Sequence, residues 1–427
     1  MNQSTADARE DAFTRFQCAL ALHENNQYKE ADSAYRELIN EFPDIWVLHF
    51  NLGLLLFELS RYEEALASYL AALELTETSI DLYYNTAICQ KTLGSFEDAI
   101  ASYQHALKID PNDIDSLYNL GCCYLAADRD EEAEAAYRKL LEVQPEHLSG
   151  MNNLAYLCHK YGSSREAASL YARILELDPA RVSADHMLAA LTGDTRQHAP
   201  SGYIQEVFDQ FSDDYENSMI EKLQYQVPAV LFDFILEHSG KTNFSSLLDL
   251  GCGTGLTGER FAAHCQSMTG IDLSAKMVEI ARSKQLYQDL HIGEIIGFLD
   301  TAPAHTYELV IAADVLPYIG DLIELFTSVV RVVKASTLFC FSVEDERTDA
   351  ARNQPLLRAS GRFSHSPHYV KTCAEKTGWL VIAAQQLDLR KERNGWIRGC
   401  IYALKRPGLE KKAAALNQPA QQKSDTQ

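Results

Sequence analysis

The sequence predicts two folds in one chain: an α solenoid in the first half, followed by an α/β domain with a mostly parallel seven-stranded sheet. Three observations support this prediction. Alanine and tyrosine recur together every 34 residues, apolar runs alternate with helical stretches after residue 200, and a glycine-rich turn follows the first of those runs. A length of 427 residues allows more than one hydrophobic core, so two domains are expected.

The recurrence in the first half keeps a constant spacing. Its alanines are Ala31, Ala65, Ala99, Ala133 and Ala167, and its tyrosines are Tyr35, Tyr69, Tyr103, Tyr137 and Tyr171. Proline closes four of the five units, at Pro43, Pro111, Pro145 and Pro179. A small alanine lets two helices approach, and a proline stops the second helix. The pattern resembles the tetratricopeptide repeat family over residues 12 to 181, which implies five repeats and a groove that binds peptides or proteins.

Asparagine recurs on the first helix of four repeats. The column consists of Asn51, Asn85, Asn119 and Asn153, with Gln17 at the matching place of the first repeat. A carboxamide donates to a carbonyl and accepts from an N–H at once, so a ladder of them suits the backbone of an extended peptide. The column is similar to the asparagine ladder of O-linked N-acetylglucosamine transferase. The alternative is that these amides bond within their own repeats.

Composition and the positions of glycine and proline indicate the domain boundaries. We expect a flexible N-terminus over 1–11, the solenoid with a capping helix over 12–192, a linker over 193–202, the α/β domain over 203–406 and a disordered tail over 407–427. The capping helix contains "RVSADHMLAAL", and the linker is polar and rich in glycine and proline.

Seven apolar, β-rich runs follow residue 203, and the first five alternate with helical stretches. They lie at 245–250, 268–273, 290–294, 307–314, 337–344, 379–387 and 396–406. Such alternation predicts a parallel sheet with helices on both faces. The last two runs are close enough along the chain to form an antiparallel hairpin at one edge.

The stretch "LLDLGCGTGLTG", residues 247–258, reads as a strand that leads into a ligand-binding turn. Gly251, Gly253 and Gly255 follow the spacing G-x-G-x-G, whereas a dinucleotide-binding turn has G-x-G-x-x-G. Leu256 stands where the third dinucleotide glycine would be. Asp249, two residues before the first glycine, would repel a phosphate and attract an ammonium or sulfonium. The sign of this charge favours S-adenosylmethionine.

Two further acids fit the same cofactor. Asp272 ends the second run, where it is placed to accept hydrogen bonds from both ribose hydroxyls. Glu294 follows the third run, where it is placed to accept from the adenine amino group. With Asp249 and the three glycines, these residues make 200–406 resemble the class I S-adenosylmethionine-dependent methyltransferases. The whole chain is similar to bacterial methyltransferases that carry amino-terminal tetratricopeptide repeats.

Aromatic residues before the first run predict a lid over the cofactor. Tyr203, Val207, Phe211 and Tyr215 are spaced four apart, with Phe208 beside them. This stretch is similar to the amino-terminal lid helices of many methyltransferases, and Tyr215 is the residue chosen to contact the cofactor. The alternative is a stripe that packs against the core. Asp314 follows the fourth run and is placed over the crevice where the methyl group would project.

Catalytic residues are harder to assign because methyl transfer requires no protein nucleophile. Tyr318, after the fourth run, is a candidate to orient the acceptor. After the fifth run, Arg362 is a candidate to hold a carboxylate and His365 a candidate base, in a segment that also contains Arg358 and His368. Surface ion pairs and helix capping are the alternative roles of that segment.

The charge of the chain is strongly negative and unevenly distributed. Through Arg196 there are 15 basic and 32 acidic residues, or 15 − 32 = −17, which leaves −5 of the total of −22 for the rest. Such a surface repels phosphate backbones and anionic lipid, so neither nucleic acid nor membrane is an expected partner. Ten scattered cysteines without a CxxC pair predict neither a metal site nor disulfides. No leader or membrane span is apparent, so we expect a cytoplasmic protein.

These features together predict a cytoplasmic methyltransferase that uses S-adenosylmethionine and whose repeats recruit a protein or peptide substrate. Two alternatives remain open at this point. The first is a small-molecule methyltransferase, acting on a carboxylate or hydroxyl, that its repeats dock to a partner. The second is a non-enzymatic adaptor with a degenerate methyltransferase fold.

Overall fold

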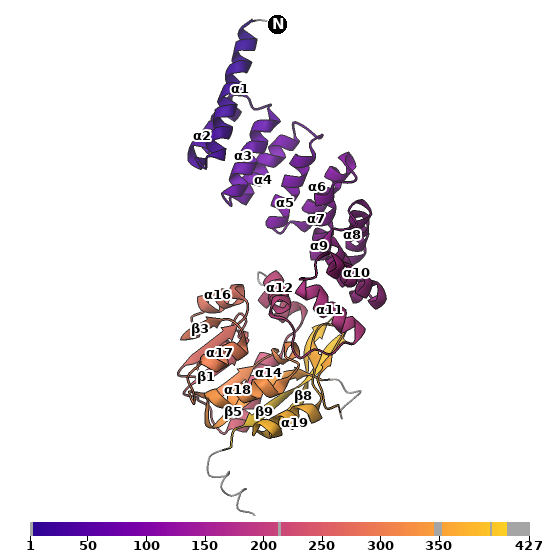
Figure 1. Ribbon diagram of the computed structural model, residues 1–427. Helices are drawn as coiled ribbons and strands as arrows, with labels where there is room; N and C mark the ends of the chain where they lie inside the picture. The colour runs from indigo at the N-terminus through magenta and orange to yellow at the C-terminus, as the bar shows by residue number, and fades with distance from the viewer. Residues whose placement is uncertain (1–2, 212–214, 346–351, 393–394, 408–427) are drawn as a thin grey trace, which may run out of the picture. The chain divides into compact units, whose positions relative to one another are not determined.

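The computed structural model describes residues 3–211, 215–345, 352–392 and 395–407 (Figure 1). The chain divides into two compact units, Met1–Leu177 and Asp178–Gln427. The first helix begins at Gln3, within the segment that the sequence analysis expected to be flexible. Residues 408–427 of the expected tail lie outside the described part of the chain.

The first unit consists, in its described residues, of helices that pair in sequence order (Figure 1). They are α1 (Gln3–Glu24), α2 (Tyr28–Glu41), α3 (Trp46–Glu58), α4 (Tyr62–Leu73), α5 (Ile80–Thr92), α6 (Phe96–Ile109), α7 (Ile114–Ala126), α8 (Asp130–Val143), α9 (Leu148–Lys160) and α10 (Ser164–Leu177). The recurring alanines and tyrosines are buried at every position. At Gly53 a Cβ would lie 2.5 Å from Cε1 of Tyr69, so the glycine makes room for the ring of the next helix.

The second unit is built on a mixed sheet whose main path runs β3-β2-β1-β4-β5-β7-β6, with β9 pairing β5 and β8. Its strands are β1 (Leu247–Leu250), β2 (Met268–Asp272), β3 (Asp289–Ile292), β4 (Tyr307–Ala312), β5 (Val333–Glu344), β6 (Leu356–Leu357), β7 (Phe363–Ser364), β8 (Leu380–Glu392) and β9 (Gly395–Lys405). β1 to β5 pair in parallel, and β9 runs antiparallel to both β5 and β8.

The sheet therefore corrects the prediction of seven mostly parallel strands. All seven expected strands form, and the hairpin of the last two is present. The additional strands β6 and β7 are two residues long, and β7 pairs with β5 at one residue, Glu344 opposite Ser364. Strands this short carry no alternating apolar pattern, so sequence periodicity does not reveal them.

Helices cover both faces of this sheet. Side chains alternate along each strand, so Leu247 and Leu309 join one apolar cluster while Leu248 and Val310 join the other. The first cluster is completed by α14 (Val227–Ser239) and α15 (Leu256–Phe261). The second is completed by α17 (Ile295–Thr301), α18 (Leu322–Val332) and α19 (Pro367–Thr377). The sheet thus has two cores, which hold the carboxyl ends of β1, β2 and β4 in place.

Helix α11 (Val182–Thr192) belongs to the second unit, whereas the sequence analysis expected it to close the solenoid. His186 on this helix is fully buried, and its Nε2 donates to the carbonyl of Gly361 over 2.8 Å. Its ring centroid lies 4.5 Å from that of Tyr203 on α12 (Ser201–Phe211). These contacts tie α11 to the α/β unit. Among the described residues, no helix has the length and apolar character needed to cross a membrane.

Candidate active site

The glycine turn connects β1 to α15 through left-handed backbone. Gly251, Gly253 and Gly255 have φ angles of +69°, +52° and +90°, which glycine adopts at little cost. A Cβ at Gly251 would collide with Val315, and one at Gly255 would lie 3.3 Å from Cε2 of Tyr287. At Gly253 the same test meets open space within 4 Å. The turn is therefore packed from below and leaves its middle glycine accessible.

Asp249 lies in β1, directly beneath this turn, and is only 1% exposed. Its Oδ2 accepts a hydrogen bond of 2.7 Å from the hydroxyl of Tyr287. Its Oδ1 is buried and has no hydrogen-bond partner among the described residues. Burial raises the pKa of this carboxyl to about 7, although the Tyr287 hydroxyl opposes the shift. One buried oxygen of a carboxyl group is thus left for a ligand.

Asp272, at the end of β2, is held by backbone N–H groups. Its Oδ2 accepts from Gly253 over 2.8 Å, and its Oδ1 accepts from Ser274 over 2.9 Å. Burial raises the pKa of Asp272, and the backbone hydrogen bonds oppose this shift. The backbone of Leu273 also hydrogen-bonds this carboxylate. A carboxylate accepts about four hydrogen bonds, so three backbone donors leave an acceptor site for a further donor.

Helix α12 bonds to the carboxyl ends of β2 and β3. Ser274, the N-cap of α16 (Ala275–Ser283), donates through Oγ to Asp209 of α12 over 2.6 Å. Ser201, at the start of α12, donates through Oγ to the carboxylate of Glu294. The predicted cofactor residues at these strand ends are therefore in contact with the predicted lid helix.

Residues of the predicted lid helix lie in two different environments. Tyr203 is buried in an apolar cluster with Phe363, and Val207 packs against that cluster. Phe208 lies between Tyr215 and Tyr318, with ring centroids at 6.3 Å and 5.4 Å. The side chain of Phe211 lies outside the described part of the chain. Tyr203 and Val207 therefore pack against the core, and the contact of Tyr215 with a cofactor remains a prediction.

Asp314 follows β4 in a left-handed conformation, with φ of +60°. Its two carboxylate oxygens accept from Nη1 of Arg390 over 2.6 Å and 2.5 Å. Arg390 also donates to Glu344 over 2.7 Å, and Arg362 donates to the same Glu344 oxygen over 2.7 Å. Glu344 is fully buried. Asp314 is therefore part of a buried charge network and is not an isolated carboxylate.

Three tyrosines surround this network. Tyr215, Tyr225 and Tyr318 are each partly exposed, and desolvation is the largest cause that raises the pKa of each hydroxyl. The negative charge of Asp314 raises all three pKa values further. The phenols therefore remain protonated at neutral pH. All three hydroxyl groups lie close enough to Asp314 to respond to its charge.

The segment after β5 contributes structure more than free chemistry. His365 is fully buried, and its Nε2 donates to the carbonyls of Ile319 over 2.9 Å and Gly320 over 3.2 Å. Burial lowers its pKa to about 4. Arg362, the other candidate there, is bonded to Glu344 and to Glu392. Arg358 lies 3.9 Å from Glu344, and His368 is exposed on α19.

The asparagine column binds largely to its own helices. Asn51, Asn85 and Asn119 each donate through Nδ2 to the carbonyl four residues earlier, over 2.7, 2.7 and 3.0 Å. Asn153 donates to the hydroxyl of Tyr137 over 3.0 Å, and Asn119 accepts from Lys91 over 3.1 Å. Each of the four side chains is partly exposed. Asn119 also contacts the Tyr84 hydroxyl at 3.5 Å, and Asn153 the Cys122 sulfur at 3.9 Å. The local bonds therefore leave a second N–H open at Asn51 and Asn85.

Sequence reasoning missed two residues of this site. Tyr287 lies in the loop between α16 and β3, and Arg390 lies on a strand far along the chain from Asp314. No motif contains either residue. Gly258 and Gly270, which make room for the ring of Tyr287, lie near it only in space, so the sequence carries no signal for this packing.

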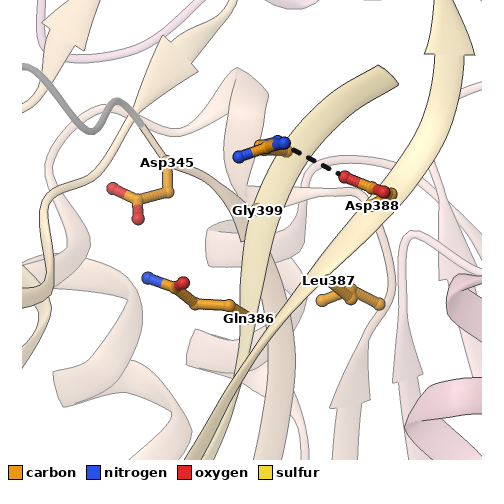
Figure 2. Close-up of a pocket in the computed structure, with 6 residues that line it drawn as sticks. Asp345, Gln386, Leu387, Asp388 and Gly399 are labelled. Atoms are coloured by element: carbon orange, nitrogen blue, oxygen red, sulfur yellow. Dashed lines mark ion pairs between the residues drawn. The ribbon is translucent and has the colours of Figure 1, made fainter.

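A hollow of about 330 Å³ lies beside the hairpin of β8 and β9 (Figure 2). It is lined by Asp345, Gln386, Leu387, Asp388, Arg398 and Gly399. Arg398 and Asp388 are opposite each other on the two strands, and Nε of Arg398 lies 3.6 Å from Oδ1 of Asp388. None of the predicted cofactor residues lines it. Within the described residues, no group of three or more His, Cys, Asp or Glu side chains is arranged to hold a metal ion.

Comparison with known proteins places both halves of the chain. Residues 247–336 match the family described as "Methyltransferase domain". Residues 18–80 and 114–147 match "Tetratricopeptide repeat", and residues 91–128 match "TPR repeat". The chain therefore combines tetratricopeptide repeats with a methyltransferase domain, as its sequence predicts.

The curated relatives that match are methyltransferases by name. A ubiquinone biosynthesis O-methyltransferase of Sodalis glossinidius is 26% identical over 164 residues, which is 36% of this chain and 66% of the relative. The protein of the same name from Vibrio cholerae is 26% identical over 121 residues, 28% of this chain and 49% of the relative. The match thus spans between about half and two thirds of these relatives.

Solved structures resemble each half at low identity. The N-methyltransferase NodS of Bradyrhizobium japonicum, in complex with S-adenosyl-L-homocysteine, is 15% identical, with 48% of this chain and 98% of that chain covered and a TM-score of 0.39. YrrB, a repeat protein with a peptide-binding site, is 19% identical, with 43% and 95% covered and a TM-score of 0.39.

Proposed function

We propose that this protein is an S-adenosylmethionine-dependent methyltransferase whose repeats recruit a protein or extended peptide as substrate. The observation that carries the cofactor assignment is Asp249, a buried carboxyl group with one unpartnered oxygen beneath an accessible glycine turn. A buried polar atom without a partner costs free energy, so it is expected to find one in the working state. An ammonium group of the ligand supplies that partner.

The residues around the turn fit this cofactor and fit a phosphate poorly. Asp249 presents a carboxyl group beneath the turn, where a dinucleotide site would present N–H groups to a pyrophosphate. Asp272 retains an acceptor site for a ribose hydroxyl, and the open space at Gly253 allows close approach. Glu294, bonded to Ser201, is exposed at the end of β3, where it would meet the adenine amino group.

The reaction requires alignment more than acid–base chemistry. When bound, S-adenosylmethionine supplies a methyl group on a sulfonium, and alignment with the acceptor provides much of the rate. Asp249 and Asp272 orient the cofactor from below. Tyr215 and Tyr318 surround the space near Asp314 and exclude water from it. Because Arg390 neutralises Asp314, that carboxylate stabilises the shape and charge of the site.

The asparagine column supports the recruitment of a peptide backbone. Within the described residues, Oδ1 of Asn51 and of Asn85 has no protein partner, and each amide retains a second N–H. A peptide backbone offers one donor and one acceptor per residue, which matches these groups. The chain's acidic first half, at −17, favours a partner with basic residues.

A second candidate function is methylation of a small molecule, with the repeats docking the enzyme to a partner. The local hydrogen bonds of the asparagines favour it, because they occupy part of the ladder. The matching relatives are also named for ubiquinone biosynthesis. An adaptor without activity is the third reading, and cofactor binding separates it from both enzymes.

Two measurements test these proposals. Calorimetry with S-adenosylmethionine should show binding that Asp272→Ala weakens by about tenfold or more, since the variant removes charge-assisted hydrogen bonds. Absence of heat with the parent protein would reject both enzymatic functions. Incubation of a cell lysate with methyl-labelled cofactor should then place the label in protein. Label in small molecules alone would select the second candidate.

A matched pair of variants tests the repeats. Asn85→Ala with Asn119→Ala should reduce labelling of protein and leave cofactor affinity unchanged. The control is Asn25→Ala with Asn112→Ala, at two exposed asparagines in turns of the same unit. Equal labelling by both double variants would reject the asparagine ladder as the recruiting surface.

A further inference from the structure

Tyr287 fills the space beneath the glycine turn. Its loop lies between α16 and β3, outside every motif used above. A Cβ at Gly258 would collide with its hydroxyl, and Cβ atoms at Gly255 and Gly270 would lie 3.3 Å and 3.1 Å from its ring. Three glycines from two elements thus make room for one ring. Packing this close fixes the position of the phenol relative to the turn.

The hydroxyl of Tyr287 ends against Asp249. It donates to Oδ2 over 2.7 Å, and burial raises its own pKa well above the ordinary value, so the phenol remains a donor. The bond directs one carboxylate oxygen toward the loop, and within the described part of the chain Oδ1 has no partner. A hydrogen bond to the charged form of a carboxyl group favours ionisation, whereas burial disfavours it.

The other ionisable groups near Asp249 oppose its ionisation or are neutral. Asp272, on the neighbouring strand β2, raises the pKa of Asp249 through its negative charge. Cys252 in the turn and Tyr225 before α14 both have pKa values raised chiefly by burial, so they remain uncharged at neutral pH. Tyr287 is thus the group that lowers the pKa of Asp249.

We infer that Tyr287 is a positioning residue of the cofactor site, which holds Asp249 ionised and oriented and thereby sets the pH above which a cationic cofactor binds. The inference rests on the proposed function, because it assumes that the ammonium group of the cofactor meets Asp249. It goes beyond that function because it assigns the pH dependence of cofactor binding to Tyr287, a residue that lies outside the glycine turn.

The test is the dissociation constant of S-adenosylhomocysteine, measured by calorimetry from pH 6 to pH 9 for the parent protein and for Tyr287→Phe. If the Tyr287 hydroxyl lowers the pKa of Asp249 by one unit, its removal should weaken binding by about tenfold at pH 6 and leave it nearly unchanged at pH 9. The ligand's amine titrates equally in both measurements, so the ratio of the two constants isolates the protein. Tyr307→Phe, at a tyrosine 5% exposed at the start of β4, is the matched control and should follow the parent.

Three results would overturn the inference. Tyr287→Phe with unchanged binding at every pH would mean that the hydroxyl has no role, and equal weakening at every pH would indicate packing alone. If Tyr287→Phe fails to fold, Asp249→Asn provides the second test, since it should remove the protein's share of the pH dependence, and a profile like that of the parent would overturn the inference. Absence of binding by the parent protein at all pH values would instead reject the proposed function.

Discussion

Arg390 provides the sharpest test of how burial controls the energy of the charge network. It is 8% exposed and makes two hydrogen bonds to Asp314, at 2.6 Å and 2.5 Å, and one to Glu344 at 2.7 Å. Substitution by methionine preserves much of the side chain's volume and removes the charge. Asp314 then loses the cation that neutralises it, and fully buried Glu344 retains Arg362.

The expected loss follows from burial. Removing one partner of a buried ion pair costs about 3 to 5 kcal/mol, because the other charge remains out of water. The same hairpin supplies a control at the surface: Arg398 pairs with Asp388 at 3.6 Å, with side chains 54% and 47% exposed. Exposed pairs contribute at most about 1 kcal/mol. Arg390→Met should therefore cost several times more stability than Arg398→Met.

Urea unfolding followed by tryptophan fluorescence measures this difference. The chain has three tryptophans, of which Trp379 and Trp396 lie in the second unit. Replacing Trp46 by phenylalanine leaves the second unit as the only reporter. If Arg390→Met and Arg398→Met lower the free energy of unfolding equally, the argument from burial is refuted. Adding Asp314→Asn to Arg390→Met should recover part of the loss, because the double variant also removes the carboxylate that lost its cation.

Three other predictions use the same unfolding assay. The folded-state pKa of Asp249, about 7, lies above its ordinary 3.8, so the cost of burying this carboxyl group is absent in acid and grows as the pH rises. The stability of Asp249→Asn relative to the parent should therefore increase by about 3 kcal/mol from pH 5 to pH 8. A difference that stays constant with pH would contradict this. The pH dependence from His365 has the opposite sign, because its folded-state pKa of about 4 lies below the ordinary 6.5. The free energy of unfolding of the parent should fall by about 3 kcal/mol from pH 7 to pH 4, and that of His365→Gln should fall by less. In the first unit, Gly53→Ala places a Cβ 2.5 Å from the Tyr69 ring and should cost about 1 to 3 kcal/mol, seen by Trp46 fluorescence; no loss would mean that the ring moves freely.

Much of the fold could be predicted from the sequence because its signals are periodic. The 34-residue recurrence depends on contacts between neighbours in the chain, so alanine and tyrosine positions predict buried helix pairs directly. The seven expected strands could be predicted because each lies in an apolar, β-rich run of the sequence. The strands β6 and β7 were missed because two residues carry no period, and α11 was assigned to the solenoid because its contacts with Tyr203 and Gly361 are distant in sequence.

The residues of the candidate site also fall into two groups, those marked by a local sequence pattern and those that depend on contacts distant in sequence. Glycines with positive φ and acids at strand ends are local consequences of a strand that leads into a turn, so Asp249, Gly251 and Asp272 could be placed from sequence. The burial of the candidate base could not be predicted from the sequence. A histidine in a polar segment looks available, and only the packing of that segment shows His365 to be fully buried.

The sequence by itself determined the two folds, the position of the glycine turn and the sign of the charge beneath it, since these depend on residues close together in the chain. Only the tertiary structure decided which of those charges are free. Arg390 reaches Asp314 from a distant strand, and Tyr287 takes one oxygen of Asp249 and leaves the other. Burial and pairing are properties of contacts between segments far apart in sequence, and they decide which charged groups remain available to a ligand.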